Sequence, residues 1–128
     1  MRGVTIRDRN ERRPGLSFDL RDVLLLLPAE FRNSSWTLSG IEAVGKSAMK
    51  LHELADKEGR IAGSELAALS EGIEQTIDGL FEAYQGEQQI PWLRIRAVDG
   101  SAFDVESEEE AVLSAIRKRF NDVTAIQI

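Results

Sequence analysis

The stretch that decides the fold is Trp92-Leu93-Arg94-Ile95-Arg96-Ala97-Val98, followed by Asp99-Gly100-Ser101 and Ala102-Phe103-Asp104-Val105. Apolar and polar residues alternate on both sides of Asp99-Gly100, and this period of two predicts a β-hairpin. A two-residue loop would place Ile95 opposite Asp104 and mix the two faces. A three-residue loop with Gly100 in the left-handed conformation instead keeps one apolar face, which consists of Leu93, Ile95, Ala97, Phe103 and Val105.

The second face of this hairpin holds the candidate interaction surface, which is Trp92, Arg94, Arg96 and Asp104. We expect Arg94 across from Asp104, as a favourable pair of opposite charges. An aromatic residue and two arginines on an outward sheet face have the composition of interface hot spots. A solvated face held by the Arg94–Asp104 pair is the alternative. Trp36, the second tryptophan, is expected in the core.

The residues after the hairpin predict a helix and a final strand. Ser107-Glu108-Glu109-Glu110 has the sequence of a capping box, and an apolar stripe follows it at helical spacing. Residues 123–128 predict a strand that returns parallel to residues 101–105 after a right-handed crossover. The C-terminal half therefore has the predicted order β-β-α-β.

The residues before the hairpin predict helices. Residues 17–27 fit either a short helix capped by Ser17 or a buried strand, and the leucines favour the helix. A helical turn is expected over 28–31. Residues 39–59 carry apolar side chains at helical spacing, and so do residues 63–86: Ile41, Val44, Ala48, Leu51 and Ala55, then Leu66, Leu69, Ile73, Ile77, Leu80, Phe81 and Tyr84. A short connection between two such helices predicts an antiparallel helical pair. The predicted fold class is α+β, with N-terminal helices packed on a small, mostly antiparallel sheet.

Length and charge indicate one acidic domain with a basic start. The chain has 128 residues, which suits a single domain, assigned to residues 17–128. Residues 1–16 contain five arginines and two acidic residues, so their net charge is +3, whereas the net charge of the whole chain is −6. They are expected to form a basic, flexible leader, although a short strand near residues 3–7 fits as well. The acidic body disfavours nucleic acid, whose binding depends on phosphate neutralisation.

Composition excludes some classes of site and of location. The sequence has no cysteine, which removes disulfides, thiolate metal ligands and cysteine nucleophiles. Its longest apolar run, Val23–Leu27, is far shorter than the roughly 18 residues that span a bilayer. We therefore expect a cytoplasmic protein without a membrane segment.

Two motifs resemble cofactor or metal sites, but their context argues against both. Residues 40–47 match the phosphate-loop pattern G-x-x-x-x-G-K-S letter for letter. A phosphate loop must follow a buried strand, whereas the apolar spacing here predicts that a helix has already begun. His52, the single histidine, has no partner motif that would predict a metal site or a general base. No cofactor or metal is predicted.

The sequence supports two functional hypotheses of different classes. The first is a non-enzymatic protein-binding or regulatory module, for example of the inhibitor or immunity type, whose acidic surface is steered to a basic target. The alternative is a small-ligand-binding domain or minor enzyme with a pocket between helices and sheet. A homodimer through the edge of the last strand is a further expectation, since open sheet edges need protection.

Overall fold

A computed structural model describes residues 1–126, apart from the side chains of residues 30 and 32. Along the chain they form β1 (Arg2–Ile6), α1 (Leu20–Leu24), the 3-10 helix η1 (Ala29–Asn33), β2 (Ser35–Val44), α2 (Ala48–Asp56), β3 (Ile61–Ala62), α3 (Gly63–Ser70), β4 (Gln75–Tyr84), β5 (Leu93–Val98), β6 (Ala102–Ser107), α4 (Glu110–Arg119) and β7 (Val123–Ala125). The first element is a strand, and the helices are short.

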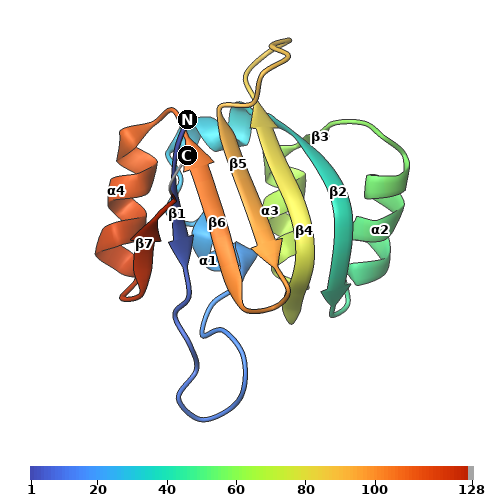
Figure 1. The fold of residues 1–128 in the computed structure, drawn as a ribbon. Coiled ribbons are helices and arrows are strands. Elements are labelled where there is room, and N and C mark those ends of the chain that lie inside the picture. The colour runs from blue at the N-terminus through green and yellow to red at the C-terminus, as the bar shows by residue number, and fades with distance from the viewer. Residues whose placement is uncertain (127–128) are drawn as a thin grey trace.

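The strands form one seven-stranded sheet in the order β3-β2-β4-β5-β6-β1-β7. Every neighbouring pair in it is antiparallel. Figure 1 shows α1 and α3 behind the sheet, α4 beside β1 and β7, and α2 beside β2. The face toward the viewer is not covered by any helix of the described residues. We call it the open face.

The core fills the space between the sheet and the helices behind it. The hairpin β5–β6 and the helices contribute fully buried side chains, among them Leu93, Ile95, Phe103, Val105, Leu20, Leu66 and Leu113. Phe18 packs against Phe103 and Phe120, with ring centroids 5.3 and 4.7 Å apart. Trp36 is fully buried on β2, as expected.

The hairpin is confirmed in its loop and in its apolar face. Val98 pairs with Ala102, so residues 99–101 form the loop, and Gly100 has a φ of 67°. The predicted pairing of charges is wrong, because this register places Arg96 opposite Asp104 and Arg94 opposite Glu106. Counting outward from the loop shifts the partner of Arg94 by two residues, which keeps the face but changes the pair.

The predicted N-terminal helical pair on a small sheet is wrong, and its first member shows why. Residues 35–44 are strand β2, and only residues 48–56 are helical. The register between β2 and β4 shifts after Ser39, where Ser39 pairs with Leu80 and Glu42 pairs with Asp78. The extra residue in β2 is a β-bulge at Gly40, whose φ is 59°. The bulge turns Ile41 inward three residues after Leu38, a spacing that looks helical.

The second member of the predicted pair, residues 63–86, is a helix followed by a strand. Helix α3 ends at Ser70, Gly72 turns the chain, and β4 begins at Gln75. Strand β4 carries apolar side chains on both faces, because Phe81 is fully buried while Leu80 and Tyr84 alternate with it on the open face. A strand that is apolar on both faces can match a helical stripe by chance.

The start of the chain lies within the sheet. Of the leader predicted for residues 1–16, residues 2–6 form β1, which lies between β6 and β7. Residues 7–19 form a long connection that projects below the sheet in Figure 1. Helix α1 is capped by Asp19 in a capping box, and the predicted Ser17 cap is not used.

The C-terminal half keeps the predicted order but differs in two details. Ser107 accepts a hydrogen bond from the Glu109 amide and donates one to the Trp92 carbonyl, so no capping box with Glu110 forms. Strand β7 pairs with β1 rather than directly with β6, because β1 occupies the place between them. It does lie at a sheet edge, as the homodimer hypothesis requires. Residues 127 and 128 of the predicted last strand lie outside the described residues.

Candidate functional site

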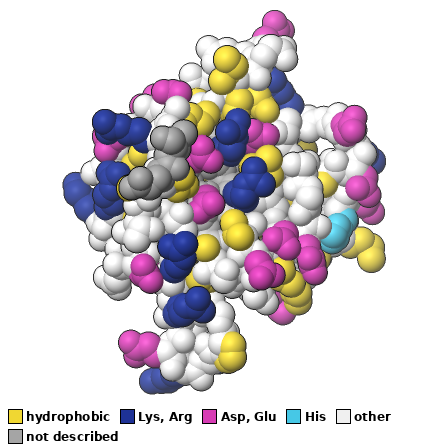
Figure 2. Space-filling model, in the orientation of Figure 1, with side chains coloured by type: hydrophobic (Ala, Val, Ile, Leu, Met, Phe, Trp, Pro, Cys, Tyr) yellow, Lys and Arg dark blue, Asp and Glu magenta, His cyan; other side chains and the backbone are white. Residues whose placement is uncertain are grey.

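The open face brings together three of the four predicted site residues. Arg94 and Arg96 of β5 and Asp104 of β6 alternate with buried residues, and their side chains lie on the face that no helix covers. Figure 2, in the orientation of Figure 1, shows basic and acidic side chains side by side over the middle of the sheet, with hydrophobic side chains among them. This mixture is the main chemical character of the face.

Arg94 is held by a carboxylate on the neighbouring strand. Its Nε donates to Glu82 Oε2 at 2.8 Å, and 34% of the Arg94 side chain and 18% of the Glu82 side chain remain exposed. Glu106 lies opposite Arg94 on the other neighbouring strand, β6. Arg94 is therefore a fixed part of the surface, and its charge is largely compensated there.

Arg96 lies in the next row across the sheet and is free of such a partner. It is exposed, with Leu80 opposite on β4 and Asp104 opposite on β6. Asp104 instead accepts a 2.6 Å hydrogen bond from the hydroxyl of Thr5 on β1. Among the described residues, the side chain of Arg96 makes no hydrogen bond or ion pair. Its guanidinium group thus remains available to an outside acceptor near the centre of the open face.

Trp92 does not belong to this surface. It is 8% exposed, and its indole Nε1 donates to Ser34 Oγ at 2.9 Å. Trp92 lies one residue before β5 begins, and its backbone amide donates to the Ala83 carbonyl. The alternation predicted Trp92 on the open face together with Arg94 and Arg96. This prediction is wrong because regular alternation starts only at Leu93, where β5 begins.

A hollow of about 310 Å³ lies beside Arg96 on the open face, and sequence reasoning missed it. It is lined from β2, β4 and β5, chiefly by Ser39, Gly40, Asp78, Leu80, Arg96 and Val98. The hollow lies at the bulge of β2, so only the pairing of distant strands reveals it. The local signals in the sequence were glycines, Gly40 on β2 and Gly79 on β4, although only the structure shows that Gly40 has a positive φ.

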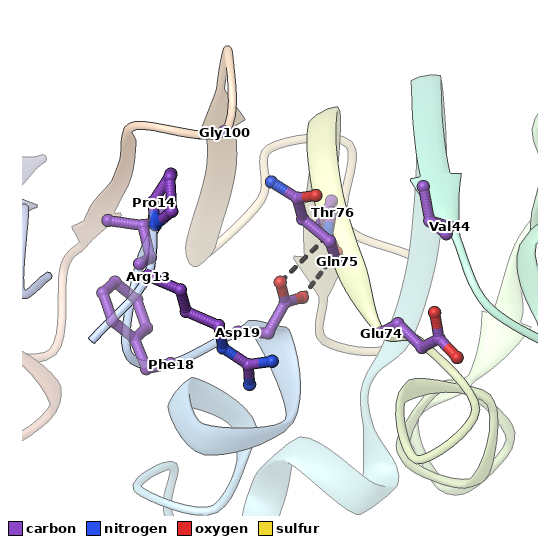
Figure 3. A pocket seen from close by; sticks show the side chains of 11 residues that line it. Arg13, Pro14, Phe18, Asp19, Val44, Glu74, Gln75, Thr76 and Gly100 are labelled. Atoms are coloured by element: carbon purple, nitrogen blue, oxygen red, sulfur yellow. Dashed lines mark hydrogen bonds between the residues drawn. The ribbon is translucent and has the colours of Figure 1, made fainter. Parts of the chain in front are cut away.

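A second cavity, of about 600 Å³, lies under the connection between β1 and α1. Figure 3 shows Asp19 directed from the start of α1 toward Thr76, with Gln75 and Arg13 among the lining residues. Both carboxylate oxygens of Asp19 are already engaged by the protein: Oδ1 accepts from Leu20 N and the Thr76 hydroxyl, and Oδ2 accepts from Thr76 N. Asp19 therefore joins α1 to β4 and has a structural reason to be there.

A third hollow, of about 660 Å³, lies between α1, η1 and α3. Its walls are mostly apolar and include Leu24, Leu27 and Phe31, and the side chain of Leu25 at its border is 76% exposed. It has the size of a small-ligand pocket, about 300–1,000 Å³. The charged residues among its described lining, Arg21 and Glu71, are both exposed.

The phosphate-loop match has no phosphate-binding geometry. Residues 40–44 are part of strand β2, and residues 42–44 pair with β4. The Ser47 amide, which a phosphate would need, donates to the Gly72 carbonyl at 2.9 Å. His52 is exposed on α2. In the part of the chain that the structure describes, no three His, Asp or Glu side chains are grouped to hold a metal ion.

Comparisons with known proteins add no family. No family model, curated protein or solved structure matches this chain. Among residues 1–126, no helix is both long and apolar enough to cross a membrane.

Proposed function

We propose that this protein is a non-enzymatic binding module that engages another protein through the open face of its sheet. The observation that carries the proposal is the guanidinium group of Arg96, which is exposed near the centre of the face and unpaired among the described residues, whereas the neighbouring Arg94 is paired with Glu82. Central arginines that become desolvated on binding are typical hot spots of protein interfaces.

The charge of the protein supports a partner of opposite sign. The net charge is −6, and on this face strands β4, β5 and β6 carry Glu82, Asp104, Glu106 and Asp78 against Arg94 and Arg96. Such a face is attracted to a basic protein surface and repelled by nucleic acid phosphates. An inhibitor or immunity-type role, in which an acidic protein is steered to a basic target, fits this charge.

Affinity capture from the native host tests the proposal with two matched variants. Arg96→Glu reverses a charge on the open face, and Lys118→Glu makes the same change on the exposed side of α4. The partner is identified by mass spectrometry, purified, and titrated calorimetrically with each variant. We expect wild type and Lys118→Glu to bind equally and Arg96→Glu to bind at least about 30-fold more weakly. Equal binding by Arg96→Glu would remove the open face as the binding surface.

The alternative, a small-ligand-binding domain or minor enzyme, is favoured by one observation, the polar cavity of about 600 Å³ beneath residues 13–19. Thermal-shift screening against metabolites and nucleotides addresses it directly. A stabilising ligand whose effect is lost on Gln75→Ala would support it, since Gln75 is exposed in this cavity and replaceable without disturbing the core.

A further inference from the structure

The hollow beside Arg96 is a built feature of the sheet. Where β2 gains its extra residue, Gly40 adopts a φ of 59° and offers no side chain to fill the space. Gly79 on β4 contributes only backbone to the same hollow. A bulge bends its strand and interrupts the regular rows of side chains. The result is a depression in an otherwise continuous face.

The lining combines an apolar wall with groups of both charges. Leu80 and Val98 supply apolar surface, and Val98 is 36% exposed. Arg96 supplies the unpaired guanidinium group. Asp78 accepts a 2.9 Å hydrogen bond from the Asp99 amide through Oδ1, and its second oxygen can accept another. An occupant must therefore satisfy a cation, a carboxylate and an apolar wall together.

These three demands select among the side chains of a partner. A carboxylate that pairs with Arg96 would lie near Asp78, and a lysine or arginine that pairs with Asp78 would lie near Arg96. An aliphatic side chain would desolvate both charges and satisfy neither, which is costly. A phenol meets all three demands, because its ring packs on apolar groups, its face attracts a guanidinium group, and its hydroxyl donates to a carboxylate.

The hollow is small for a ligand pocket, and it has room for one side chain from a partner. At about 310 Å³ it lies at the lower end of the range for small-ligand pockets, about 300–1,000 Å³. It is shallow and opens on the broad face described above, as expected of a pocket that receives one anchor residue from a large partner.

We infer that this hollow is the anchor pocket of the open face and receives a tyrosine side chain from the partner protein. The inference rests on the proposed function, since it names the group that the open face recognises. It predicts that filling the hollow abolishes binding even when every charge on the face is kept.

Ser39→Phe fills the hollow from its rim, and Thr37→Phe is the matched control. Both positions are on the same face of β2, but only Ser39 lines the hollow. With the purified partner, we expect Ser39→Phe to lose at least about 30-fold in affinity and Thr37→Phe to lose about 3-fold or less. Equal losses, or none from Ser39→Phe, would overturn the anchor pocket. The open face itself would still be decided separately by Arg96→Glu.

A fragment titration tests the same pocket on the wild-type chain without any partner. The fragments are p-cresol, acetate and methylguanidinium, and the readout is the amide chemical shifts of Gly40, Gly79 and Ala97. We expect saturable shifts at these amides with p-cresol, and their loss in Ser39→Phe. Larger shifts with acetate or methylguanidinium, or no response to p-cresol, would contradict a phenol site.

Discussion

The strand pairs β5–β6 and β2–β4 are both antiparallel neighbours in one sheet, yet they are built differently. Between β5 and β6 the register runs without interruption from Leu93–Ser107 to Val98–Ala102. Between β2 and β4 it shifts twice, after Ser39 and again after Glu42. The second shift cancels the first, since β4 then contributes the extra residue. Regular pairing between β2 and β4 is therefore interrupted at residues 40 and 41 of β2 and continues on both sides.

The two strand pairs therefore contribute differently to the protein, one to the core and the other to the exposed surface. The regular pair presents one fully buried face to the helices and supplies the ladder around which the core packs. The bulged pair β2–β4 is irregularly paired, and it forms a hollow with Gly40 at its edge. Bulges occur often next to binding sites because they redirect side chains without breaking the strand. We therefore expect stability to depend mainly on the regular pair, and recognition on the bulged pair.

The largest expected effect is the loss of stability on truncating the regular pair. Ile95→Ala empties a fully buried position and should cost about 2–5 kcal/mol. Leu80→Ala, on the open face of the bulged pair, should cost about 1 kcal/mol, because its side chain is only partly buried. Urea unfolding of both variants measures the two values. A cost for Leu80→Ala as large as for Ile95→Ala would break the proposed division.

The next effect compares the glycines at the ends of the two pairs. Gly45, after β2, has a φ of 129°, and a Cβ there would lie 2.5 Å from the Gly72 carbonyl oxygen. Gly45→Ala should therefore cost about 2–4 kcal/mol. Gly100→Ala, in the β5–β6 loop, should cost about 1 kcal/mol, because its φ of 67° is milder and the only close neighbour is the flexible Gln75 amide. Thermal unfolding midpoints rank the two variants, and the reverse order would contradict this account.

The smallest effect lies outside both pairs and serves as their control. Hydrogen bonds from Arg117 and from Arg2 lower the pKa of Glu110 below its ordinary value. A carboxylate with a lowered pKa stabilises the folded state above the pKa of the unfolded chain, and this stability is lost as the pH falls through the folded pKa. Glu110→Gln should be slightly less stable than wild type at neutral pH, and the two should converge in acid. A constant gap in unfolding midpoint across this range would exclude the linkage.

The hairpin was predictable because its information is local. Alternation over residues 93–97 and the Asp99-Gly100 turn fix both the loop and the buried face. Arg94, Arg96 and Asp104 follow from the same alternation, so their shared face was predicted correctly. Trp92 was not, because alternation says nothing about the residue before a strand begins.

The rest of the sheet was not predictable in this way. The spacing of apolar residues in β2 and β4 depends on how each strand pairs and packs with distant parts of the chain. The bulge makes Leu38 and Ile41 both point inward, and a spacing of three favours a helix in any local reading. Strand β4 is apolar on both faces, since it packs on the core through Phe81 and borders the hollow through Leu80. The hollow itself depends on Ser39 meeting Leu80, which only the folded sheet establishes.

The place of β1 in the sheet sets a condition on how the chain reaches its native state. Thr5 is hydrogen-bonded to Asp104, 99 residues later in the chain. Strand β1 therefore finds its neighbours, β6 and β7, only after the roughly one hundred residues between them have been synthesised. Contacts between such distant residues are slow to form, because the entropy of loop closure is lost before strand pairing contributes any stabilising free energy. Until β1 pairs with it, β6 has an exposed strand edge, and such edges make a folding chain prone to aggregate.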